Sequence, residues 1–375
     1  MEKNIFKLNF RGRELIVEHG ELAKQAHGAV LVRYGDTVVL STAVVSKNAN
    51  ILSDFFPLMV LYQEKLYSVG KIPGGFIKRE GRPTEAATLG ARMIDRPMRP
   101  LFPENFRNEV QVVNTILSVD QDNTPEMTAL FGSSLATSIS QIPFNGPVAG
   151  VKVGRINGEF IINPTAEQTE LSDIDLTVAG TKDAINMVEA GAKEVSEKDM
   201  LDALMFGHDA IKELVAFQEE IIDKIGVTKM DYEVLEITDE LKEEINTLAH
   251  DDLDKAFRIK DKLEKYEAID KIKENILEKY ENENQNLKEA ELKELLTKVS
   301  LVLADIEYKI FRNIVVTEKT RADGRTMTEI RPISTDIDLL PRTHGSALFT
   351  RGQTQSLSTV TLGALGEHQI LDGLG

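Results

Sequence analysis

A concentration of basic residues between positions 65 and 100 is the first feature of the sequence that could do chemistry. Eight basic side chains lie there against three acidic ones, Glu80, Glu85 and Asp95, so the stretch carries +5 in a chain whose net charge is −17. Because the remainder is acidic, a bound polyanion would have to be held at such a local concentration. The basic residues are Lys65, Lys71, Lys78, Arg79, Arg82, Arg92, Arg96 and Arg99.

The same stretch divides into a loop and a helix. Its glycine and proline residues predict a loop over 70–83, with Phe76 and Ile77 at an apolar tip. Beyond Thr84 the spacing predicts a helix through Ile94, ended by a proline-induced break before Arg99. Arg92 and Arg96 are four residues apart and so share one helix face.

Two interpretations of these arginines remain open. Planar guanidinium groups beside an apolar tip suit a single-stranded polyphosphate backbone with a base against the tip. Alternatively, Arg92 and Arg96 pair with Glu85 and Asp95 and merely fasten the helix. Spacing alone favours neither interpretation.

Composition limits the class of protein. A length of 375 residues predicts two or three domains, and 42% hydrophobic with 28% charged residues is typical of a globular protein. The absence of cysteine excludes disulfides, thiolate nucleophiles and cysteine-ligated zinc, and suits a reducing cytoplasm. The start shows no apolar signal segment, and no apolar run approaches 18 residues, so we expect no membrane insertion.

The chain is predicted to comprise three regions. Residues 1–226 mix strands and helices, with hairpin turns at Tyr34-Gly35-Asp36 and Asn157-Gly158 and helices over 127–142 and 196–225. Residues 227–318 lie in a stretch without glycine or proline that predicts about three helices, divided by polar clusters near Asp251 and at 281–285. Residues 319–375 form the third region.

The third region repeats the first. His27–Thr42 reads HGAVLVRYGDTVVLST and His344–Thr359 reads HGSALFTRGQTQSLST, with eight identities at a constant offset of 317. His27 and His344 recur with their glycine neighbours, which favours a shared turn over a pair of catalytic bases. Only 31 residues follow His344, too few to close a second α/β core, so we expect the chain to stop inside a repeat.

Long motifs resemble the bacterial polynucleotide phosphorylase family. They cover the whole chain and are FFPLMVLYQEKLYSVG with KIPGGFIKREGRPTEAATLGARMIDRPMRPLFP, FNGPVAGVKVG, INPT, DIDLTVAGT, FGHDAI, RADGR and LPRTHGSALFTRGQTQ. The resemblance implies an α/β (α+β) fold: a ribonuclease PH-type core (ribosomal protein S5 domain 2-like), an all-α domain and a truncated second core.

The resemblance also implies a function. Members of the family degrade single-stranded RNA from the 3′ end by phosphorolysis in mRNA turnover, with inorganic phosphate as co-substrate and Mg²⁺ assisting, as cytoplasmic homotrimers that enter RNA-degradation complexes. The 71–83 loops of three subunits would line the ring entrance. RNA-binding residues would then be Phe76, Ile77, Lys78, Arg79, Arg82, Arg92, Arg96 and Arg99, with Phe76-Ile77 and Lys78-Arg79 where the family often has two aromatics and two arginines.

Catalytic residues are expected beyond Gly375, because the family's working site belongs to the second core. Where an active core would show a serine run, this chain reads Asn123-Thr124-Pro125-Glu126. Asp173 and Asp175, two apart, are weak candidates for metal binding, and we favour a structural role for them. An alternative is that residues 1–375 act by themselves as a non-catalytic RNA-channel and trimer-assembly module. A third hypothesis, an α/β protein that binds an anionic small molecule, does not explain the repeat.

Overall fold

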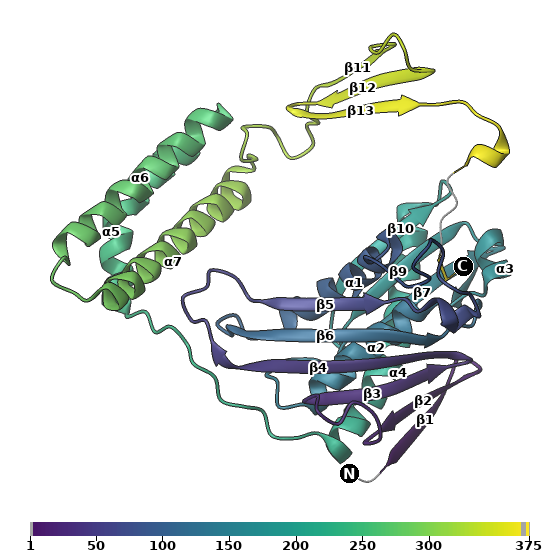
Figure 1. Ribbon diagram of the computed structural model, residues 1–375. Coiled ribbons are helices and arrows are strands. Elements are labelled where there is room, and N and C mark those ends of the chain that lie inside the picture. The colour runs from purple at the N-terminus through teal and green to yellow at the C-terminus, as the bar shows by residue number, and fades with distance from the viewer. Residues whose placement is uncertain (1–2, 369–372, 375) are drawn as a thin grey trace. The chain divides into compact units, whose positions relative to one another are not determined.

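The computed structural model describes residues 3–368 and 373–374 and divides into two compact units (Figure 1). The first unit comprises Met1–Val234 with residues of the C-terminal tail, and the second comprises Leu235–Ile370. Of the closing LDGLG segment, only Gly373 and Leu374 lie within the described residues. None of the described helices combines the length and apolar character needed to cross a bilayer.

A six-stranded sheet forms one layer of the first unit, in the order β1-β2-β3-β4-β6-β5 (Figure 1). Every neighbouring pair is antiparallel except β5 with β6. The predicted turn at Gly35-Asp36 is confirmed, since Tyr34 pairs with Thr37 across it. The strands are β1 (Asn4–Phe10), β2 (Arg13–His19), β3 (Gly28–Tyr34), β4 (Thr37–Ala49), β5 (Leu58–Gln63) and β6 (Asn108–Ser118).

A second, four-stranded sheet in the order β10-β9-β7-β8 completes the strands of this unit. The Asn157-Gly158 turn joins β7 to β8 as predicted. The strands are β7 (Ala149–Ile156), β8 (Glu159–Ile162), β9 (Ile174–Gly180) and β10 (Ile185–Ala192), and the short helix α3 (Ala166–Leu171) precedes β9.

Helix α2 (Pro125–Ile139) lies between the two sheets and joins their cores (Figure 1). It contacts β3, β4 and β6 on one side and β7 on the other, and every residue except Glu126 is buried. The long helix α4 (Glu197–Ile225) packs on β7 and β9, and Ser196 caps its start as predicted by accepting a hydrogen bond from the Asp199 N–H (3.1 Å). The first unit is therefore held by one continuous core.

Helix α1 (Glu85–Met98) follows the basic loop and runs four residues further than predicted. Thr84 caps it by accepting from the Ala87 N–H (2.9 Å). Pro97 falls in the last turn, where its missing N–H costs one helical hydrogen bond without breaking the preceding turns. The helix therefore passes directly into a 3₁₀ turn at Arg99–Leu101.

Three helices open the second unit, α5 (Asp239–Phe257), α6 (Lys262–Glu283) and α7 (Glu289–Asn313), and α7 ends in a π-helical turn at Ile314–Glu318. The break expected near Asp251 was wrong. Helix α5 continues to Phe257 because Leu253 and Ala256 extend its buried stripe. The break expected at 281–285 is confirmed by the end of α6 at Glu283.

The first unit extends past the predicted boundary at residue 226. The Val227 N–H donates to the Ile139 carbonyl (3.2 Å), and Lys229 Nζ donates to the carbonyls of Ser138 and Ser140 (both 2.7 Å) at the end of α2. Because a helix C-terminus exposes unpaired carbonyls, a lysine here satisfies groups that would otherwise lack donors.

A three-stranded antiparallel sheet, β11 (Ile333–Ile337), β12 (Gly345–Arg351) and β13 (Thr354–Val360), closes the second unit. Its hairpin repeats β3 and β4 in register: Gly28 pairs with Ala43, and Gly345 pairs with Val360, both shifted by 317. The shared-turn interpretation of the histidines is confirmed. Nδ1 of His27 accepts from the Val45 N–H (3.1 Å), and Nδ1 of His344 accepts from the Leu362 N–H (2.9 Å).

Candidate nucleic-acid interface

The basic loop 70–83 is closed at its base by two hydrogen bonds. Glu80 Oε1 accepts from the Leu66 N–H (3.2 Å), and Thr84 Oγ1 donates to Glu64 Oε2 (2.6 Å). Hydrogen bonds from its own N–H and that of Leu66 hold the pKa of Glu80 below its usual value, so the carboxylate stays ionised. The sequence analysis assigned no role to Glu64 or Glu80, because nothing in their spacing predicts that they accept the hydrogen bonds that close the loop.

The tip of this loop exposes apolar side chains. Phe76 is fully exposed (101%), Ile77 is 81% exposed and Ile72, which we had not singled out, is 77% exposed. Gly75 and Lys78 adopt positive φ angles on either side of Phe76 and Ile77, which turns the tip outward. A cluster of solvent-exposed apolar side chains indicates a contact surface rather than part of the core.

Four cations of the basic stretch have side chains that form no hydrogen bond or ion pair with any described residue: Lys78, Arg79 and Arg82 on the loop, and Arg92 on α1. All four are exposed. Arg92 lies on α1, whose opposite face is anchored by Ile94 and Met98 and by the close approach of Gly90 to the Tyr62 ring. We call Phe76, Ile77 and these four cations the loop site. Lys71 differs, since its Nζ donates to the Gly373 carbonyl (3.2 Å).

Arg96 and Arg99 are engaged by the protein itself. Arg96 forms an ion pair with Glu189 of β10 (2.7 Å). Arg99 donates twice to Asp95 (2.7 and 3.0 Å), and also to the carbonyls of Phe56 and Leu58 (both 3.1 Å). Of the two interpretations left open, the pairing of Arg92 and Arg96 with Glu85 and Asp95 is absent among the described residues, and Arg96 pairs with Glu189 instead. Because its donors are committed to α1 and the chain around β5, Arg99 is left out of the loop site.

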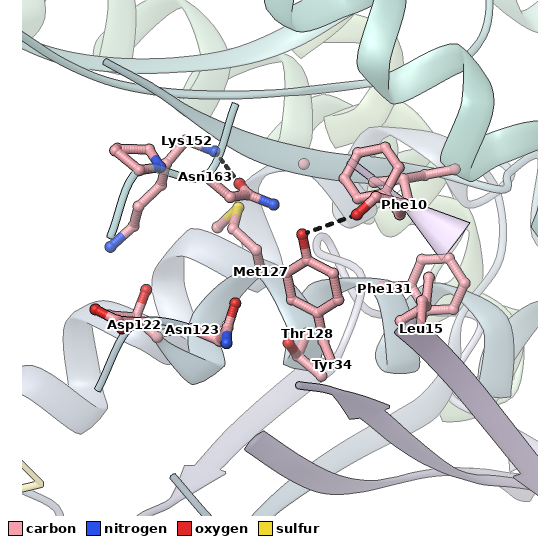
Figure 2. A pocket seen from close by; sticks show the side chains of 14 residues that line it. Phe10, Leu15, Tyr34, Asp122, Asn123, Met127, Thr128, Phe131, Lys152 and Asn163 are labelled. Carbon is pink, nitrogen blue, oxygen red and sulfur yellow. Dashed lines mark hydrogen bonds between the residues drawn. The ribbon is translucent and has the colours of Figure 1, made fainter. Parts of the chain in front are cut away.

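Asn123 and Thr124 border a small pocket of about 40 Å³ at the start of α2 (Figure 2). The Asn123 amide is occupied, since its Oδ1 accepts from Arg13 (2.8 Å) and its Nδ2 donates to Asp120 (2.6 Å). Pro125 lacks an N–H, and Glu126 adds negative charge to the first turn. The apolar part of the lining consists of Phe10, Leu15, Tyr34, Met127, Phe131 and Leu214. This helix start is therefore unsuited to binding phosphate.

Asp173 forms an ion pair within the first unit. Arg155 donates to both of its carboxylate oxygens (2.7 and 3.0 Å) and pairs with Asp199 (3.1 Å). These hydrogen bonds keep the pKa of Asp173 below its usual value. Asp175 is exposed on β9. Across residues 3–368 and 373–374, no group of three or more histidine or acidic side chains could hold a metal ion.

Three family models match the chain. The 3′ exoribonuclease family, domain 1, matches residues 11–143, and domain 2 of that family matches residues 146–210. A model described as polyribonucleotide nucleotidyltransferase, RNA binding domain, matches residues 240–326. The first two matches confirm the predicted ribonuclease PH-type core in the first unit.

Individual proteins are also similar to the chain, two of them over its full length. Polyribonucleotide nucleotidyltransferase of Enterococcus faecalis is 60% identical over 375 residues, covering 100% of this chain and 53% of the relative. That of Bacillus subtilis is 56% identical over 374 residues, covering 100% and 52%. A crystal structure of rice Rrp46 covers 59% of this chain and 94% of its own, with 13% identity and a TM-score of 0.44. The chain spans about half the length of the curated relatives it matches.

Proposed function

Because the chain belongs to the polyribonucleotide nucleotidyltransferase family, we propose that its protein degrades single-stranded RNA from the 3′ end by phosphorolysis in mRNA turnover. In that reaction inorganic phosphate attacks the phosphorus of the terminal phosphodiester. The bond to the preceding 3′ oxygen breaks, and a nucleoside diphosphate is released. The shortened RNA keeps the 3′ hydroxyl.

Within that protein, residues 1–375 supply RNA binding and assembly rather than catalysis. The observation that carries this is the loop site: a fully exposed aromatic ring, with cations on the same loop and on α1 whose side chains pair with no described residue. Bases of any sequence can stack on an aromatic ring while guanidinium and ammonium groups neutralise the phosphates. Such a site captures a single strand without selecting its sequence.

The first core does not provide the groups that phosphorolysis needs. The start of α2 offers an occupied amide, a proline and a glutamate where a phosphate would bind. The residues described here also do not fit Mg²⁺, since Arg155 holds Asp173 and Asp175 stands alone on its strand. Family membership supports Mg²⁺ and phosphate bound elsewhere in the full protein. It also supports a cytoplasmic homotrimer within an RNA-degradation complex.

Residues 1–375 by themselves are a non-catalytic RNA-binding and trimer-assembly module under the same proposal. The net charge of −17 supports a local RNA contact rather than diffuse attraction.

The test is nucleoside diphosphate release from poly(A) with phosphate and Mg²⁺. Full-length protein is expected to release the diphosphate in a phosphate-dependent reaction. Purified residues 1–375 are expected to bind the RNA without producing nucleoside diphosphate. Steady release by residues 1–375 would overturn the assignment of catalysis to other parts of the protein. Full-length protein that leaves poly(A) intact would overturn the activity itself.

A further inference from the structure

The second unit carries a further concentration of positive charge. Residues 240–326, which match the RNA binding domain model, contain 17 basic and 21 acidic residues. An acidic helical region cannot attract RNA through its average charge, so any contact with RNA must use a local group of cations. The sequence drew attention only to the first such group, at 65–100.

These cations line a basin of about 720 Å³. It is bordered by the start of α6, the end of α7, the loop 321–332 and the turn between β12 and β13, all within the second unit. Seven basic and two acidic side chains line it. The net charge of these lining residues, +5, equals that of the 65–100 stretch, although the charged residues of the basin are spread over more than 90 residues of sequence.

Four of the basic residues build the walls of this basin. The Lys265 ammonium donates to the Ala322 carbonyl, and Arg321 donates to the Glu329 carbonyl (2.9 Å). Arg325 and Arg331 both pair with Asp323 (2.9 and 3.4 Å), which neutralises one of the two carboxylates. The Lys265 contact joins the 321–332 loop to α6, and the other three contacts lie within that loop.

The other three basic residues, Lys260, Lys262 and Arg351, are exposed, and their side chains form no hydrogen bond or ion pair with the part of the chain that the structure describes. The second carboxylate, Asp261, caps α6 by accepting from the N–H groups of Leu263 and Glu264 (2.9 and 3.0 Å). Because this carboxylate is turned onto the helix, it does not pair with the lysine on either side of it.

An aromatic side chain completes the basin. Tyr266 lies one helical turn after Lys262, lines the same hollow and is 55% exposed. An exposed ring beside unpaired cations is the combination that binds a single strand: the ring stacks on a base, and the cations neutralise the flanking phosphates.

We propose that this basin is a second binding site for single-stranded RNA, with Lys260, Lys262 and Arg351 on backbone phosphates and Tyr266 against a base. The inference rests on the proposed function, which makes RNA the substrate. A polynucleotide suits the site better than a single nucleotide because the free cations come from separate elements around a wide hollow. The basin would hold a strand apart from the loop site and lengthen the RNA that one chain binds.

The test compares matched variants of residues 1–375 in fluorescence anisotropy with a labelled oligo(A), titrated over a range of KCl concentrations. Lys260→Glu with Lys262→Glu should weaken binding and flatten the log–log salt dependence by about 1.4, at roughly 0.7 for each phosphate of a single strand that is no longer neutralised. The control, Lys271→Glu with Lys293→Glu, makes the same charge change outside the basin, on exposed lysines whose side chains pair with no described residue, and should leave the slope unchanged.

The aromatic group is tested separately. Tyr266→Ala should weaken binding by roughly 5- to 100-fold, whereas Tyr266→Phe, which keeps the ring, should bind like the wild type. Crosslinking with RNA that contains 4-thiouridine should place an adduct on the peptide around Tyr266. Thermal unfolding of each variant should match the wild type, because the substituted side chains are exposed.

A loop-site variant, Arg79→Gln with Arg82→Gln, separates this inference from the proposed function. If the loop variant loses affinity while the basin variant keeps the wild-type slope, the basin proposal is overturned and the proposed function stands. If neither variant loses affinity, both fail. If the basin variant loses poly-glutamate binding as much as RNA binding and Tyr266→Ala has no effect, the basin is a general acceptor of acidic chains and the RNA proposal is overturned.

Discussion

At the scale of single residues, two arginines of one short segment differ in whether their guanidinium groups are already hydrogen-bonded by the protein. Arg92 and Arg99 lie seven positions apart, yet Arg92 forms no hydrogen bond or ion pair with described residues and Arg99 donates to Asp95 and two carbonyls. A guanidinium has five N–H donors in a fixed fork, so its available function is decided by how many donors the protein already occupies.

Arg92→Gln should therefore reduce RNA affinity without affecting stability. We expect the log–log salt dependence to flatten by roughly 0.7, because one phosphate of the strand is no longer neutralised, and the thermal midpoint to stay at the wild-type value. Arg99→Gln is the paired control. It should lower the thermal midpoint, because the carbonyls of Phe56 and Leu58 lose their donor, and leave the salt slope intact. The reverse pattern would show that Arg92 is the structural residue.

Phe76→Ala should cost about 1–3 kcal/mol of RNA binding free energy if a base stacks on the exposed ring. Ile77→Ala should cost less, because a branched aliphatic side chain offers no flat surface. Equilibrium binding to oligo(A) measures both, with Phe76→Tyr as a variant that retains the ring. Equal losses at the two positions would favour simple apolar contact over stacking.

At the scale of elements, the two copies of the hairpin differ in how closely other elements pack against their first strand. A Cβ added to Gly28 would lie 1.9 Å from the carbonyl oxygen of Ala136, because α2 passes directly over β3. A Cβ added to Gly345, the same residue of the repeat, would meet nothing closer than Val360 Cβ at 3.7 Å. The local hairpin is the same, and the packing over it differs.

Gly28→Ala should therefore destabilise the first unit by an amount near the upper end of the ~1–3 kcal/mol typical of overpacked cores. Gly345→Ala should be neutral or slightly stabilising, because it reduces the freedom of the unfolded chain without a clash. Urea unfolding followed by circular dichroism measures both. Similar losses for the two variants would mean that a helix also covers β12 in solution.

At the scale of the whole molecule, stability is unevenly distributed between the two units. The first unit has a continuous core around α2, and the helices of the second unit share a smaller one. Strands β11 and β13 are exposed along their whole length, whereas most of β3 and β4 alternates between buried residues and half-buried or exposed ones.

Hydrogen exchange should follow that difference. Amides of β12 and β13 should exchange much faster than those of β3 and β4 under the same conditions, since opening the outer sheet exposes little apolar surface. Mass spectrometry of peptides covering 345–360 and 28–43 gives an internally matched comparison, because the two segments are copies. Equal protection would show that the outer sheet is covered in solution, by another chain or by another part of this one.

Local patterns in the sequence were sufficient for much of the architecture. The turns at Gly35-Asp36 and Asn157-Gly158, the Ser196 cap and the repeat at an offset of 317 depend on neighbouring residues, and each is present as predicted. The break expected near Asp251 failed because a cluster of surface charges does not end a helix whose buried stripe continues through Leu253 and Ala256.

By itself, the sequence determined the family, the ribonuclease PH-type core, the helical interval and the exposed aromatic at Phe76. Only the tertiary structure decided which cations are available. Arg99 donates to carbonyls more than 40 positions away, and Arg351 shares one basin with Lys260 and Lys262 although it is far from both lysines in the chain. Spacing along the chain reports which residues share an element. Pairing of charges is set by distance in space, which depends on how separate elements pack.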